Sequence, residues 1–86
     1  MAYRIAFTRS AAKVMKKLPQ EVYAAVWKEL EKIAKAPFAY HPKVTRLKNT
    51  ESFRLRIGGW RVIYTIQKEK VIILVLKIGS RGEVYR

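Results

Sequence analysis

The sequence predicts an α+β domain in the order β-α-α-β-β-β, in which a helical hairpin packs on one face of a small, largely antiparallel sheet. Two apolar stripes with helical spacing lie before residue 37, and from residue 43 onward apolar and polar side chains alternate as they do in strands. A Gly-Gly pair between two alternating segments marks a hairpin. Because 86 residues do not enclose two cores, the whole chain, residues 1–86, is predicted to be one domain.

The first half of the chain predicts a strand followed by two helices. Residues 3–7 alternate in polarity, and Thr8 or Ser10 can cap the helix that follows. The apolar side chains of this helix fall at i, i+3, i+4 and i+7, and they are Ala11, Val14, Met15 and Leu18. Pro19 ends the helix and suits the first turn of the next one. The second apolar stripe consists of Val22, Val26, Leu30 and Ile33.

Beyond the helices the sequence predicts a short strand or extended segment over residues 43–48 and a longer strand after it. In that longer strand, Arg54 and Arg56 share one face. The other face carries Phe53, Leu55 and Ile57. One side of this strand is therefore apolar and the other cationic.

The remaining strands follow a tight turn. Gly58 and Gly59 predict a two-residue turn, since both can take positive φ. The strand after it places Arg61 on the same face as Arg54 and Arg56, called the arginine face below. Its core residues are Trp60, Val62, Tyr64 and Ile66. Residues 71–78 are apolar on both faces, as expected of a central strand.

The formal net charge of +13, from nineteen basic and six acidic residues, is the strongest global property of the chain. Self-repulsion of this size destabilises a compact domain and is usual where the partner is a polyanion. Composition therefore favours nucleic acid or another acidic partner.

Composition also excludes several classes of protein. The chain has no cysteine, no aspartate and one histidine, His41, which is too few ligands for a metal site. No cofactor is expected. The amino terminus lacks the apolar region of a secretory signal, and the longest apolar run, residues 71–76, is too short to span a bilayer. We therefore expect a cytoplasmic protein without a membrane partner.

An arginine cluster is the feature most informative about function. Arg54 and Arg56 stand two apart on one strand and Arg61 lies across the hairpin, so the three must lie close together. The nearest carboxylate in the sequence, Glu51, sits in a turn. Each arginine taken singly is more often a solvated surface residue. Together, like charges at this separation cost free energy, which indicates that an anion completes the site.

Two residues near the end of the chain, Arg81 and Tyr85, can reach the same face if the strands pair as neighbours. Guanidinium groups bind phosphate, and RNA carries its own nucleophile, the 2′-OH beside each phosphate. Arg61 and Arg81 suit stabilisation of the developing negative charge. Neighbouring cations favour the phenolate of Tyr85, which makes it the preferred group for proton transfer.

The chain resembles the RelE/ParE superfamily of toxins from type II toxin–antitoxin pairs, and the RelE branch more closely. The resemblance rests on residues 47–48, 53–58, 60–64 and 78–86, and the order of elements agrees over the whole chain. It implies an mRNA interferase, a metal-independent endoribonuclease that cleaves message in the ribosomal decoding site. It also implies a small antitoxin that blocks this activity.

The resemblance also assigns roles to residues. Arg61 and Arg81 match arginines that hold the scissile phosphate, Tyr85 matches a terminal tyrosine, and Arg54 stands at a strand position that is often lysine. These four form the expected catalytic set. The residues expected to bind RNA are Arg56, Lys48 and Arg46.

A function of another class remains open: a non-enzymatic toxin or binding module, either a ParE-like inhibitor of DNA gyrase or a basic RNA-binding module. Arg61, Arg81 and Tyr85 favour the nuclease. Ser80, which stands where many RelE relatives carry a histidine, favours the alternative. The expected partners are a short acidic antitoxin, the ribosome and mRNA.

Overall fold

The computed structural model describes residues 2–80, and the predicted site residues Arg81 and Tyr85 lie outside this range. The elements are β1 (Arg4–Phe7), α1 (Arg9–Lys17), α2 (Gln20–Lys35), β2 (Val44–Arg46), β3 (Ser52–Ile57), β4 (Trp60–Gln67) and β5 (Ile72–Ser80). The predicted α+β class and element order are confirmed. Residues 43–48 contain the short strand β2, so the full order is β-α-α-β-β-β-β.

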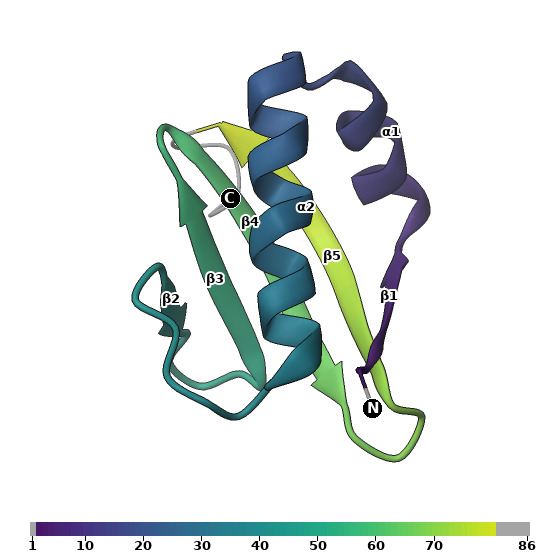
Figure 1. The fold of residues 1–86 in the computed structure, drawn as a ribbon, viewed down its shortest axis with the longest axis vertical. Coiled ribbons are helices and arrows are strands. Elements are labelled where there is room, and N and C mark those ends of the chain that lie inside the picture. Colours follow the sequence, from purple (N-terminus) through teal and green to yellow (C-terminus); the bar gives the residue numbers. More distant parts are fainter. Residues whose placement is uncertain (1, 81–86) are drawn as a thin grey trace.

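The strands form one five-stranded sheet in the order β1-β5-β4-β3-β2. β1 pairs with β5 in parallel, and the other three pairings are antiparallel. Figure 1 shows both helices on the same face of this sheet, with α1 against β5 and α2 reaching from β1 to β3. Neither helix has the length and apolar character needed to cross a membrane.

Local signals explain where the helices begin. Of the two candidate caps, Thr8 is the one used: its Oγ1 accepts a hydrogen bond from the Ala11 N–H at 3.3 Å. Pro19 stands at the N-cap of α2, one residue before the first turn in which the sequence predicts it. Its carbonyl accepts from the Tyr23 N–H at 2.9 Å and so begins the helical ladder.

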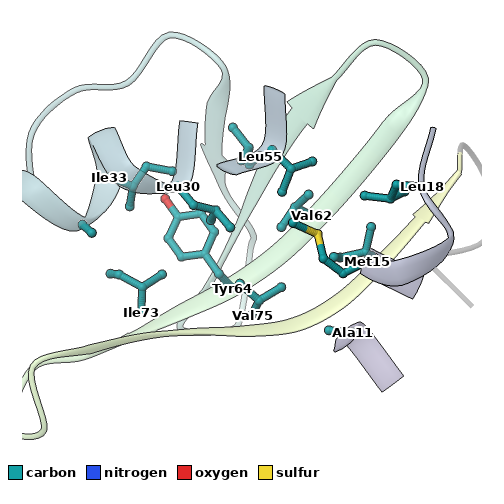
Figure 2. Close-up of a cluster of buried hydrophobic side chains, with 13 residues drawn as sticks. Ala11, Met15, Leu18, Leu30, Ile33, Leu55, Val62, Tyr64, Ile73 and Val75 are labelled. Atoms are coloured by element: carbon teal, nitrogen blue, oxygen red, sulfur yellow. The ribbon is translucent and has the colours of Figure 1, made fainter. Parts of the chain in front are cut away.

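The core lies between the two helices and the sheet (Figure 2). Tyr64 of β4 stands in its centre, with its hydroxyl pointing toward Leu30 and Ile33 of α2. The buried members of this core are Ala11, Met15, Leu18, Val26, Leu30, Ile33, Ala34, Leu55, Val62, Tyr64, Ile73, Val75 and Ile78. Trp60 and Ile66 are half-buried against them, so the predicted inward face of β4 is confirmed.

The hairpin between β3 and β4 turns at the predicted glycines, because Ile57 pairs with Trp60. Only Gly58 has positive φ, at 56°, although the sequence allows it at both positions. Val71, the predicted first residue of the last strand, instead lies in the preceding turn with φ of 59°. Strand β5 therefore starts one residue later than expected.

A β-bulge lies between β4 and β5. Ile63 pairs with Lys77 whereas Tyr64 pairs with Val75, so Leu76 has no Cα partner on β4. The extra residue reverses the alternation of β5 beyond it, since Val75 and Ile78 both face the core. The Leu76 carbonyl accepts a hydrogen bond from Thr8 Oγ1 at 2.7 Å, which ties the start of α1 to the bulge.

Candidate phosphate-binding site

The face of the sheet opposite the helices carries the predicted arginine cluster. Arg56 of β3 pairs directly with Arg61 of β4. The Arg56 N–H points away from β4 and donates to the Lys43 carbonyl at 2.9 Å, so this is a non-hydrogen-bonded pair of the β3–β4 ladder. Side chains approach most closely in such pairs, with Cβ atoms about 5 Å apart. The hairpin thus places two arginines at directly neighbouring positions on this face.

Arg61 is the buried member of the pair, with 8% of its surface exposed. Its Nη1 donates to the Trp60 carbonyl at 3.5 Å, and its Nε has no hydrogen-bond partner among the described residues. Gly79 pairs with Arg61 from the β5 side and brings no side chain to that flank. A buried N–H without a partner costs free energy unless an acceptor completes it. An anion is the acceptor best suited to a guanidinium.

Arg54 lies one row further along the same face. Its neighbours across the sheet are Thr45 on β2 and Ile63 on β4, and Lys77 follows on β5. Lys77 extends the cationic face beyond the residues identified from sequence. Reading β5 with strict alternation from Val75 assigns Lys77 to the core, and only the bulge turns it outward.

The acidic residues within residues 2–80 lie on other elements than the strands of this face. Of the acidic residues in the described range, three lie on α2 and Glu51 and Glu69 lie in turns. The two ion pairs found within residues 2–80 both use Glu29, which lies 3.6 Å from Lys32 and from Lys43. The same range holds no group of three or more histidine or acidic residues that could bind a metal. The face therefore offers positive charge to an anion.

Two of the predicted RNA-binding residues lie elsewhere. Arg46 pairs with Phe53, which places it on the helix side of the sheet, with its Cζ 5.9 Å from the centre of the Phe53 ring. Lys48 lies beyond β2, in the turn that leads to β3. Both line an open hollow of about 610 Å³ formed by residues 46–51. The structure brings together Arg54, Arg56 and Arg61 but not Arg46 or Lys48.

Two other titratable side chains have structural roles. Burial raises the pKa of the Tyr64 phenol, so this group stays protonated inside the core. His41 Nε2 lies 2.8 Å from the Ala36 carbonyl and closes the loop after α2. Neither side chain belongs to the arginine face.

Comparisons with known proteins point to one family. The family model described as the ParE toxin of the type II toxin–antitoxin system parDE matches residues 5–85. The mRNA interferase toxin RelE of Escherichia coli strain K12 is 31% identical over 87 residues, which cover 99% of this chain and 92% of that protein.

Solved structures agree with this family. The isolated E. coli RelE toxin superposes with a TM-score of 0.82 at 27% identity, covering 98% of this chain and 92% of that one. RelE in the archaeal RelE–RelB complex from Pyrococcus horikoshii gives a TM-score of 0.80 at 26% identity, covering 96% and 99%.

Proposed function

Because this chain belongs to the RelE/ParE superfamily of type II toxins, we propose that it is a ribosome-dependent mRNA endoribonuclease. The observation that carries the proposal is the Arg56–Arg61 pair, in which a buried arginine whose Nε has no hydrogen-bond partner within residues 2–80 is paired with a second arginine. The same face also carries Arg54 and Lys77. Such a face suits an RNA phosphate.

In the proposed reaction the 2′-oxygen of the message attacks the adjacent phosphorus and the 5′-oxygen of the next nucleotide leaves. Arg61 and Arg56 stabilise the charge that grows on the phosphate oxygens, and burial holds Arg61 in place before the reaction. The products are a 2′,3′-cyclic phosphate and a 5′-hydroxyl. Tyr85 and Arg81, outside the described residues, are proposed as the proton-transfer group and a further phosphate ligand. The ribosome supplies the positioning of substrate that so open a face lacks.

The proposed partner is a short acidic antitoxin that covers the arginine face. The RelE of P. horikoshii is found in a complex with RelB, and the family model describes toxins of two-component systems. A net charge of +13 favours an acidic protein for the same role here. The proposed place of action, with ribosomes and message, is the cytoplasm.

The test compares wild type, Arg61→Ala and Arg61→Lys on message bound to ribosomes. Arg61→Ala should lower the cleavage rate about 10²–10³-fold, the cost of removing one preorganised donor. Arg61→Lys keeps the charge but not the planar fork, so its rate should fall between the two. Thermal unfolding should show that both variants remain folded. A 5′-phosphate on the downstream product, or full activity of Arg61→Ala, would refute this mechanism.

Inhibition of DNA gyrase is the second candidate function, and the match to the ParE family model favours it. The two functions separate in cells that express the chain. The nuclease leaves transcripts cut within translated regions and stops protein synthesis. Broken DNA with intact transcripts would establish gyrase as the target.

A further inference from the structure

The loop between α2 and β2 exposes two aromatic side chains. Phe38 is 67% exposed and Tyr40 is 85% exposed. Among the described residues, the other large apolar side chains with high exposure are Tyr23 and Val71, at 43% and 44%. Exposure of two rings within three residues leaves apolar surface in water.

This loop has a defined shape. Pro37 and Pro42 restrict its backbone, and the Ala36 carbonyl receives the Ala39 N–H at 3.1 Å and contacts His41 Nε2 at 2.8 Å. The Lys43 ammonium, 3.6 Å from Glu29, fixes the end of the loop on α2. The rings are therefore presented by a preorganised segment, and a ligand would lose little free energy in ordering it.

Lysines lie on both sides of the rings in the sequence, and one of them contacts Phe38. Lys68, from the turn between β4 and β5, places its Nζ 6.0 Å from the centre of the Phe38 ring. Residues 32–50 contain no acidic side chain, and their basic residues are Lys32, Lys35, Lys43, Arg46 and Lys48. Glu29 pairs with two of these lysines, Lys32 and Lys43. Glu51 and Glu69 line a hollow together with Lys68. Aromatic rings set among lysines are typical of surfaces that bind single-stranded nucleic acid, where bases stack on the rings and lysines meet phosphates.

We propose that Phe38, Tyr40 and Lys68 form an aromatic platform on which unpaired RNA bases stack. A protein partner fits less well, since the exposed apolar surface here is confined to two rings, one of them in contact with a lysine. The Phe38–Lys68 side of the platform lies at the opposite end of β4 from Arg61, since Lys68 is seven residues or about 23 Å along the strand. Tyr40 lies nearer the arginines, three residues before Lys43, whose carbonyl accepts from the Arg56 N–H. The platform is thus a second RNA contact, and it would hold a strand without taking part in cleavage.

The experiment measures binding of a single-stranded 2′-O-methyl RNA of about 12 nucleotides, whose blocked 2′-oxygen prevents cleavage. Phe38→Ala and Tyr40→Ala should each weaken binding about tenfold, the effect of losing one stacked base. The slope of log affinity against log salt should stay unchanged, because no charge is removed. Lys68→Gln should instead reduce that slope by about 0.7. Tyr23→Ala, which removes an exposed ring elsewhere, should bind as wild type does.

A second experiment measures binding of an abasic strand of the same length. This strand should bind wild type and the Phe38→Ala and Tyr40→Ala variants with equal affinity, because it has phosphates but nothing to stack. Phe38→Ala and Tyr40→Ala should weaken binding of normal RNA in the Arg61→Ala background as well. The test of the platform therefore does not depend on whether the chain is a nuclease. Unchanged RNA affinity in both ring variants would overturn the platform. Weaker binding of a protein partner with unchanged RNA binding would assign the surface to that partner and also overturn it.

Discussion

Arg61 and Tyr64 lie three residues apart on β4. Both are buried, but their side chains lie on opposite faces of the sheet. Tyr64 faces the helices, where its ring stacks on Phe53 with centroids 5.3 Å apart. Arg61 faces away from the helices, and its Nε has no hydrogen-bond partner in the part of the chain that the structure describes. Burial keeps the Tyr64 phenol neutral within the core, whereas the buried Arg61 guanidinium belongs to the proposed phosphate site.

The buried phenol predicts a specific loss of stability in alkali. Burial raises the folded-state pKa of Tyr64 above the unfolded value of about 10. The stability it contributes is therefore complete below about pH 10 and is lost as the pH rises toward the folded pKa, by up to about 1.4 kcal/mol per pH unit.

The measurement is the free energy of unfolding in denaturant at a series of pH values on both sides of pH 10. Tyr64→Phe should show a flatter alkaline decline than wild type, even if it is less stable at neutral pH. Tyr40→Phe, an exposed control, should follow the wild-type curve. Parallel curves for wild type and Tyr64→Phe would contradict the prediction.

At the scale of elements, the β3–β4 hairpin connects sequence to site. Its turn sets the register that pairs Arg56 with Arg61, and the β5 bulge adds Lys77 to the same face. A slip of one residue in this hairpin would exchange the arginines with the core residues Leu55 and Val62. By fixing this register, the turn glycines keep the core residues of the hairpin buried and keep Arg56 paired with Arg61.

The two turn glycines should respond differently to alanine. A Cβ at either position meets nothing within 4 Å, so packing does not distinguish them. Gly58 has φ of 56°, where an alanine costs about 1 kcal/mol of unfolding free energy. Gly59 lacks positive φ, so Gly59→Ala should be neutral or slightly stabilising. Denaturant unfolding of the two variants tests this difference, and an equal loss in both would contradict it.

For the whole molecule, charge dominates encounters with partners. A net charge of +13 is spread over a chain with a radius of gyration of 11.9 Å. The field of such a body draws in anions before any contact forms and is screened by salt. The same positive field attracts RNA and an acidic antitoxin, so the two should compete for binding to the chain.

Association with the proposed acidic antitoxin should therefore slow markedly as salt rises. Between about 50 and 200 mM salt we expect the association rate constant to fall about tenfold or more, with a smaller change in the dissociation rate. Stopped-flow mixing at several salt concentrations measures both rates. An association rate independent of salt would show that steering by charge does not govern this encounter.

Much of the fold follows from the sequence by itself. The stripes of α1 and α2 match the buried faces of both helices, since an amphipathic helix has only one apolar side to bury. Alternation and the glycine pair set the β3–β4 register, which places Arg54, Arg56 and Arg61 on one face. These features are local: each depends on residues close together in the chain.

Only the tertiary structure decided the features that join distant segments. Nothing local in β1 specifies its parallel pairing with β5, because that pairing connects residues nearly seventy positions apart. The Leu76 bulge turns Lys77 outward and Ile78 inward, and strict alternation cannot show where an extra residue enters a strand. Arg46 likewise alternates as a strand residue should, yet its pairing with Phe53 puts it on the helix side. The sequence determined which side chains each element offers, and pairing across the sheet decided which of them meet.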